Sequence, residues 1–124
     1  MNRTTELPDL VIGELHINPP IIQGGMGVLV SSSRLAAAVS NEGALGVVAA
    51  VGAGDDSDLK NLSYREWSMQ GLRKILRKAR TLTSNPIAVN VMCALSNYDD
   101  LVRSAAAEKV AEIISGAGLP LKLT

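Results

Sequence analysis

Short apolar runs and amphipathic segments alternate along most of the chain. The runs at 45–51 and 87–92 are apolar at almost every position, which is typical of strands that are buried on both faces. Between them, segment 64–83 has an apolar stripe at helical spacing and ends before Asn85-Pro86. The pattern predicts two buried strands joined by a long helix, with a stripe formed by Met69, Leu72, Ile75, Leu76 and Ala79.

Capping residues and spacing predict two shorter helices and one more strand. A serine hydroxyl within 31–33 can accept from free amides of a first helical turn, and Gly43 can end that helix in the left-handed conformation. Asn97 is the predicted cap of the next helix, and a strand is predicted at 110–115. The apolar positions of these two helices are Leu35, Ala38 and Val39, then Leu101, Val102 and Ala105.

The amino-terminal part of the chain has a different pattern. Segment 11–17 reads as a β-ribbon, because apolar residues flank the turn-forming pair Gly13-Glu14. A short extended run at 21–23 then stops at Gly24-Gly25. We interpret this run as the first strand of the main sheet.

The resulting order of elements is four strands separated by three helices. Such alternation predicts an α/β fold in which parallel strands are joined by right-handed crossovers, forming a single domain over residues 1–124. The polar loop at 52–62 contains Asp55, Asp56 and Asp58, but their spacing lacks the glycine and the distal glutamate of a calcium loop. No metal site is therefore expected.

Composition excludes several classes of protein. The chain has 12 basic and 12 acidic side chains, so an arm that binds nucleic acid is not expected. The single cysteine, Cys93, excludes an internal disulfide and fits a reducing compartment. The start of the chain does not resemble a secretory signal. The whole sequence contains no apolar run long enough to span a membrane. The expected location is the cytoplasm.

Residues suited to ligand binding follow three of the predicted strands. Ligands of parallel α/β folds lie outside the carboxyl ends of the strands. Glycines there let the backbone approach a ligand, and an amide side chain can donate and accept at the edge of a heterocycle. The candidates at these ends are Gln23, Gly24, Gly25, Met26, Gly27, Asn90, Ser115 and Gly116.

Each candidate also has a purely structural interpretation. The glycines can be ordinary turn residues, and the amide of Asn90 can serve a hydrogen bond within the fold. Ser115 is more often a capping or turn serine than a nucleophile, since no histidine or carboxylate is placed to activate it. Cys93 fits a small buried hydrophobe, and His16 lies in the amino-terminal ribbon, far from the strand ends.

Four motifs follow one another along the chain: PIIQGGMG at 20–27, LAAAVSNEGALGV at 35–47, VNVM at 89–92 and ISGAGLPL at 114–121. In this order they resemble the start of the nitronate monooxygenase family, formerly called 2-nitropropane dioxygenases. The flavin-dependent enoyl-acyl-carrier-protein reductases are similar in much of the first motif. The resemblance covers nearly the whole chain from about residue 10.

The resemblance implies a (β/α)8 TIM barrel that binds FMN at the carboxyl ends of its strands, of which this chain would supply the amino-terminal half, ending after the fourth strand. It implies that the backbone of Gly25, Met26 and Gly27 lies against the flavin ring and that Asn90 bonds its polar edge. Gln23 and Gly24 would shape the turn. Ser115 and Gly116 would line the same mouth.

The implied reaction is oxidation of an alkyl nitronate with molecular oxygen by a flavoprotein. Family members that act on neutral nitroalkanes use a histidine base further along the chain. His16 does not match that base, so the catalytic residues stay unknown. Two alternatives stay open: reduction of an enoyl-carrier-protein substrate with NAD(P)H, or a non-catalytic half-barrel that self-associates through its exposed sheet edges.

Overall fold

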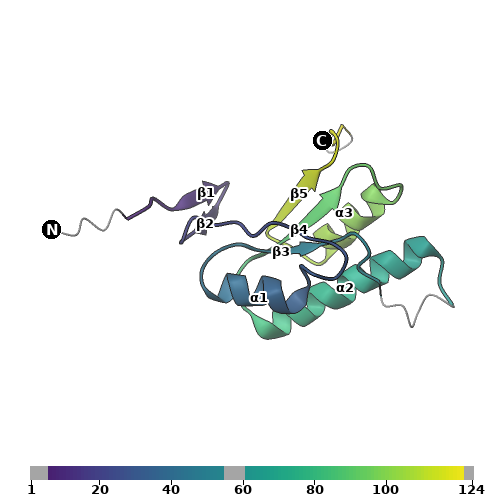
Figure 1. The fold of residues 1–124 in the computed structure, drawn as a ribbon, viewed down its shortest axis with the longest axis horizontal. Coiled ribbons are helices and arrows are strands. Elements are labelled where there is room, and N and C mark those ends of the chain that lie inside the picture. Colours follow the sequence, from purple (N-terminus) through teal and green to yellow (C-terminus); the bar gives the residue numbers. More distant parts are fainter. Residues whose placement is uncertain (1–5, 55–60, 122–124) are drawn as a thin grey trace.

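The computed structural model describes residues 6–54 and 61–121. They form a parallel sheet with helices on one face, preceded by a small antiparallel hairpin (Figure 1). Asp55, Asp56 and Asp58 lie outside these residues. In chain order the elements are β1 (Leu10–Ile12), β2 (Leu15–Ile17), α1 (Ser33–Asn41), β3 (Gly46–Ala49), α2 (Tyr64–Leu82), β4 (Ile87–Met92), α3 (Tyr98–Ala107) and β5 (Glu112–Gly116).

The main sheet consists of β3, β4 and β5 in that order, all parallel. Val48 pairs with Val89, and Val89 pairs with Ile113, so the three strands lie in register with their carboxyl ends at one edge. This arrangement confirms the predicted parallel α/β class.

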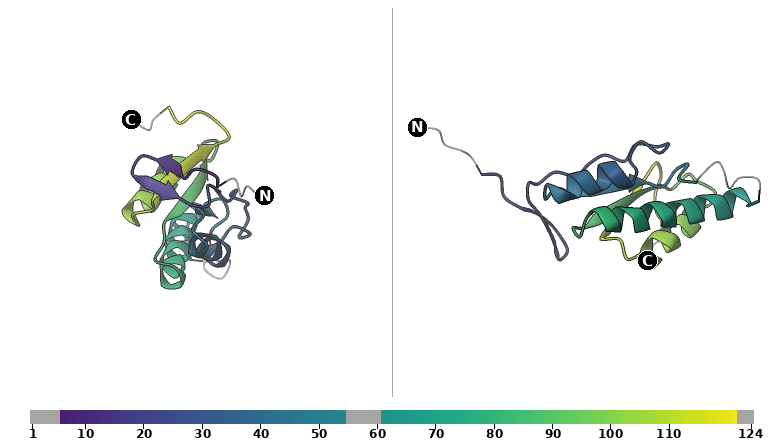
Figure 2. Two further views of the ribbon diagram at one scale, coloured as in Figure 1. Left: turned by 90° about the vertical axis from the view of Figure 1, so that its left-hand side faces the viewer. Right: turned by 90° about the horizontal axis from the view of Figure 1, so that it is seen from below.

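The three helices cover one face of the sheet, and α2 lies between α1 and α3 (Figure 2). The core between helices and sheet contains aliphatic side chains of β3 and β4 together with Leu72, Leu76 and Leu101. The predicted stripes of α2 and α3 are buried or half-buried there.

The predicted apolar stripe of α1 is wrong. Leu35 and Ala38 are exposed, and the buried face consists of Ser33, Ala36, Ala37 and Ser40. The reason is close packing: a Cβ at Gly46 of β3 would collide with the carbonyl oxygen of Ala36. At that separation small side chains fill the interface, and a leucine would overfill it.

The amino-terminal β1 and β2 form an antiparallel hairpin in which Val11 pairs with His16. The hairpin packs against the second face of the sheet. Ile17 contributes to a small core with Val47 and Ala88, near the amino ends of the strands. One half of that face is therefore covered, while the half at the carboxyl ends of the strands is not part of this core.

Residues 21–23 do not form a regular strand. Ile22 makes an isolated parallel bridge with Leu45, through Leu45 N–H donating to Ile21 (2.9 Å) and Gln23 N–H donating to Leu45 (3.0 Å). Beyond this point the backbone leaves β3 and the side chain of Gln23 continues the pairing. Its Nε2 donates to Val47 O (3.1 Å), and its Oε1 accepts from Val47 N–H (3.2 Å).

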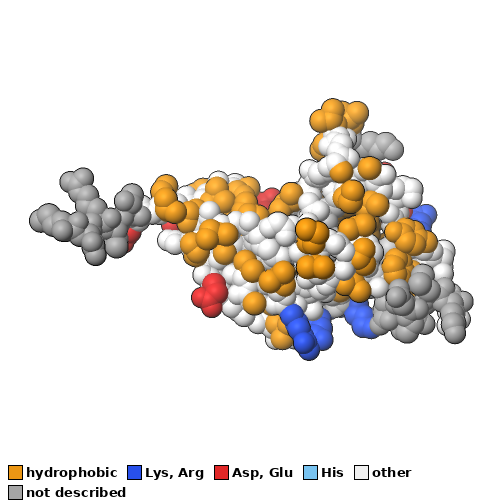
Figure 3. Space-filling model, viewed as in Figure 1, with side chains coloured by type: hydrophobic (Ala, Val, Ile, Leu, Met, Phe, Trp, Pro, Cys, Tyr) orange, Lys and Arg blue, Asp and Glu red, His pale blue; other side chains and the backbone are white. Residues whose placement is uncertain are grey.

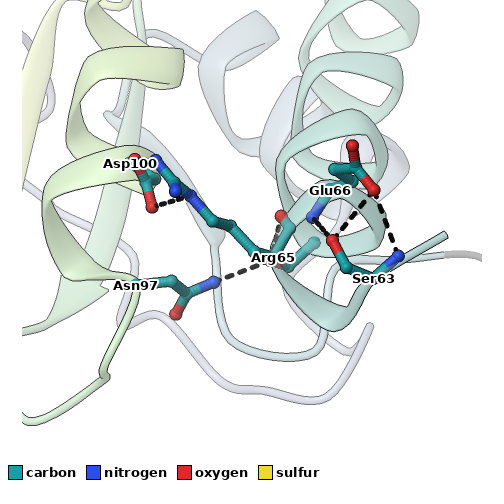
Figure 4. A network of polar contacts seen from close by, with 6 residues as sticks. Ser63, Arg65, Glu66, Asn97 and Asp100 are labelled. Carbon is teal, nitrogen blue, oxygen red and sulfur yellow. Dashed lines mark hydrogen bonds and ion pairs between the residues drawn. The ribbon is translucent and has the colours of Figure 1, made fainter.

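The N-cap residues of α1 and α3, Ser32 and Asn97, lie at the predicted positions, but the predicted side-chain capping bonds are absent. Asn97 instead donates to the hydroxyl of Ser68 (2.7 Å) across the contact between α3 and α2. The hydroxyl that caps a helix belongs to Ser63, which with Glu66 forms a reciprocal capping box at the start of α2 (Figure 4).

The space-filling view shows apolar side chains spread from the hairpin to the end of β5 (Figure 3). Several of the largest exposed ones belong to the loop after Gln23: Met26, Val28, Leu29 and Val30 are each more than half exposed. Within the described ranges, no helix is both long and apolar enough to cross a lipid bilayer.

Candidate functional site

The orientation of Asn90 follows from its neighbours in β4. Val89 and Val91 are fully buried on the helix-covered face, whereas Ala88 belongs to the core under the hairpin. Because side chains alternate along a strand, Asn90 shares the face of Ala88 and lies one step nearer the carboxyl end. Its half-buried amide therefore stands at the border between the covered and the open half of that face.

Asn90 connects two of the predicted strand ends. Its Nδ2 donates to the carbonyl of Ile114 in β5 (3.3 Å). On its other side lies the backbone of Gly25, so close that a Cβ there would stand 2.7 Å from Asn90 Cβ. The structure thus brings the glycine loop, β4 and β5 together around one amide, as the sequence predicted.

Two glycines of this edge have no structural reason to be glycine. Gly24 and Gly116 both have negative φ, and a Cβ added to either would meet no atom within 4 Å among the described residues. Gly116 pairs with Met92, so its missing side chain would extend on the same face as Asn90. The bare backbone at these two positions therefore leaves open space at the strand ends.

The other glycines of the loop are explained by packing. A Cβ at Gly27 would collide with the side chain of Val51, and one at Gly25 would meet Asn90. The backbone N–H of Met26 is already used, because it donates to the hydroxyl of Ser31 (2.9 Å). That N–H is therefore not available to a cofactor, while the Met26 side chain is 60% exposed.

Ser115 was predicted to line the mouth, but its side chain lies on the other face of the sheet. Its hydroxyl lies 2.6 Å from the phenol oxygen of Tyr98 in α3, on the helix-covered face. The neighbouring Ile114 packs in the core under the hairpin, on the opposite face. Both faces of β5 carry apolar neighbours, so the sequence alone did not indicate which way Ser115 points.

The site is uncharged. Asn90 is the polar side chain at its centre, and the other contributions are backbone groups of Gly24, Gly25 and Gly116. The pKa shifts of the structure arise elsewhere, at the start of α2 (Figure 4). Hydrogen bonding to Asp100 raises the pKa of Arg65, and hydrogen bonds from Ser63 lower that of Glu66. His16 stays on the hairpin, and no cluster of three metal-ligating side chains occurs in the described ranges.

Sequence reasoning missed the importance of Ser31. It is 2% exposed, and its hydroxyl touches three different groups of the loop rather than capping α1. A signal was the row of three serines after the three apolar residues at 28–30, since one helix needs only one cap.

Parallel strands joined by helices that cover one face of the sheet place the chain in the α/β class. Comparison with known proteins agrees. FabK from Thermotoga maritima superposes with a TM-score of 0.65 at 35% identity, covering 83% of this chain and 28% of FabK. A single-substitution mutant of the same protein gives the same TM-score.

A family model described as nitronate monooxygenase matches residues 9–120, so the chain belongs to that family, which consists of flavin-dependent oxidoreductases. The nitronate monooxygenase of Paraburkholderia phytofirmans is 40% identical over 79 residues, which is 64% of this chain and 18% of the relative. That of Pseudomonas aeruginosa is 36% identical over 92 residues, 74% of this chain and 22% of the relative. The matches thus span about a fifth of these relatives.

Proposed function

We propose that this chain is the flavin-ring-binding part of an FMN-dependent oxidoreductase that oxidises alkyl nitronates with molecular oxygen. The observation that carries the proposal is the open space at Gly24 and Gly116, where an added Cβ would meet no described atom within 4 Å, at the strand ends that also carry the half-buried amide of Asn90. Family membership supplies the identity of the group that fits this space.

In this proposal the residues have separate tasks. Asn90 keeps its Oδ1 and the second N–H of its Nδ2 for the polar edge of the ring, because among the described residues its amide makes a single bond, from Nδ2 to Ile114 O. The backbone of Gly24, Gly25 and Gly116 provides a surface without side chains against which the ring lies. Bound FMN would supply the electron transfer, as cofactors do in such enzymes.

The half of the sheet face at the carboxyl ends of the strands has apolar surroundings. The hairpin covers the half at the amino ends of the strands, where Ile17 packs with Val47 and Ala88, and leaves the half at the carboxyl ends for a ring. Exposed Met26 and Val28 are near this edge in sequence and offer an apolar rim, which suits an alkyl substrate. The described residues at the site contain no titratable group that could act as a base.

A second candidate is reduction of an enoyl-carrier-protein substrate with NAD(P)H. It is favoured by the superposition on FabK, an enoyl-ACP reductase, over 83% of this chain. The two functions differ in the electron donor. Anaerobic bleaching of the protein-bound flavin by NADH favours the second, and bleaching by a nitronate favours the first.

Ring binding can be tested without the phosphate of FMN. Lumiflavin has the isoalloxazine ring and no phosphate, and the sites named above contact the ring alone. The chain should therefore quench the fluorescence of lumiflavin and of FMN with similar affinities, because both ligands have the same ring. We expect the two dissociation constants to agree within about threefold, which corresponds to a difference in binding free energy of about 0.7 kcal/mol and is small beside ring stacking.

Gly116→Val is the informative variant, because it adds bulk where the structure has open space. It should leave thermal unfolding unchanged and weaken lumiflavin binding at least about tenfold, as expected when a branched side chain displaces a stacked ring. Ala111→Val likewise creates a branched side chain, at the exposed residue before the amino end of β5, and is the matched control. Equal affinities of the two variants, or no quenching by the unmodified chain, would refute the proposed site.

A further inference from the structure

Ser31 is the centre of a hydrogen-bond network in the glycine loop. Its Oγ accepts from Met26 N–H (2.9 Å) and from Gln23 Nε2 (3.1 Å), and it donates to Gly24 O (3.3 Å). Its backbone N–H donates to Met26 O (2.9 Å). One buried serine therefore contacts the chain on both sides of Gly25.

The same network is tied to the sheet at two points. Ala49 N–H of β3 donates to Ser31 O (2.9 Å), and the amide of Gln23 pairs with both backbone groups of Val47. Val47 and Ala49 are the residues of β3 whose N–H groups point away from β4. The loop thus occupies the edge of β3 where a further strand would lie.

Side-chain burial does little to fix this loop. Met26, Val28 and Val30 are exposed by about three fifths, and Leu29 stands at φ +59°, a conformation that costs an ordinary residue free energy. The packing of Gly27 against Val51 is one apolar contact of the loop. The position of Gly24 and Gly25 therefore depends mainly on the polar bonds made by Ser31 and Gln23.

We propose that Ser31 is a positioning residue for the flavin: acting with Gln23, it holds the backbone of Gly24 and Gly25 beside Asn90, so that these groups together form the surface on which a flat ring lies. This inference rests on the proposed function, because it assumes that the ring lies at this edge. Ser31 itself does not touch the ring. It is buried behind the loop, and its hydroxyl bonds are used within the protein.

Ser40 provides a matched control for a purely structural role. It is also fully buried, and its hydroxyl accepts from Gly46 N–H (2.9 Å) and donates to Pro86 O (2.8 Å). It lies where β3 and β4 begin, at the end of the sheet opposite the glycine loop. Ser31→Ala therefore removes three hydroxyl hydrogen bonds within the glycine loop, and Ser40→Ala removes two at the opposite end of the sheet.

The experiment compares lumiflavin affinity and the visible circular dichroism of the bound flavin in both variants. Ser31→Ala should bind lumiflavin about tenfold more weakly, because the loop loses hydrogen bonds that hold it in the binding conformation. The dichroism spectrum of the bound flavin should also change. Ser40→Ala should lower the melting temperature to a similar extent and bind within about twofold of the unmodified chain. Equal losses of affinity in the two variants would overturn the positioning role.

Hydrogen exchange keeps the inference testable if Ser31→Ala does not fold. In the unmodified chain the Met26 amide should be protected, and saturating lumiflavin should protect it further, because the ring holds the loop in place. A Met26 amide that exchanges at the rate of an unstructured peptide, or one that lumiflavin does not affect, contradicts the proposal. Failure of the unmodified chain to bind lumiflavin refutes the proposed function, whereas normal binding by Ser31→Ala refutes only the role of Ser31.

Discussion

Replacing Gln23 by methionine tests how the edge of β3 is held. Methionine has nearly the same length but cannot bond Val47, whose N–H and C=O both pair with the Gln23 amide. Val47 is 0% exposed, so both backbone groups lose their partners in a buried position. An unpaired buried group costs about 1–3 kcal/mol. Water entering beside the half-buried Gln23 offsets part of this, and we expect a loss of about 2–4 kcal/mol.

The assay is urea unfolding followed by circular dichroism, with amide exchange at Val47 as a local readout. Asn41→Ala serves as the control, because the Asn41 amide also bonds a backbone carbonyl, that of Leu82 (3.1 Å), but at an exposed position. This control should change the free energy of unfolding by less than about 0.5 kcal/mol. A Gln23→Met variant that is as stable as Asn41→Ala, with Val47 still protected, would show that the side chain does not replace a strand.

Two further predictions concern packing and pH. Gly25→Ala should destabilise the chain by about 1–3 kcal/mol, because the new Cβ would lie 2.7 Å from Asn90 Cβ. Adding Asn90→Gly to this variant should restore part of the loss. Calorimetry of the single and double variants measures the effect, and strictly additive changes in unfolding free energy would contradict it. Hydrogen bonds from Ser63 lower the pKa of Glu66 below its ordinary value of 4.5, so the capping box stabilises the fold above that pH, and its contribution disappears as the pH falls through the lower pKa of the folded state. The difference in unfolding free energy between the unmodified chain and Glu66→Gln should accordingly shrink in acid, and a difference that is constant from about pH 7 to pH 3 would refute this role of Glu66.

Elements with strong local signals were predicted well. The strand at 87–92 has the predicted bounds, and α2 ends one residue before the predicted end, because Asn85-Pro86 prevents a helix from continuing. Asn90 and Gly25 meet as predicted, since the carboxyl ends of parallel strands share one edge.

The failures arise where the partner is distant in the sequence. The run at 21–23 looks like a strand, but a side chain takes over its pairing with Val47, which no local pattern shows. The face of α1 was misjudged because hydrophobicity favours Leu35, while the closeness of Gly46 selects small residues. The face of the sheet on which Ser115 lies could not be predicted, because apolar and polar residues do not alternate in a strand that is partly buried on both faces.

The most direct test of the account is a titration of the 15N-labelled chain with lumiflavin, followed by amide chemical shifts. A ring stacked at the strand ends should move the amide signals of Gly24, Gly25, Asn90 and Gly116, and leave those of the hairpin at Val11 and His16 unchanged. Shifts centred on the hairpin, or no shifts up to the solubility limit of lumiflavin, would contradict the claim. The claim is that the glycines and the Asn90 amide at the carboxyl ends of the strands form a flavin site.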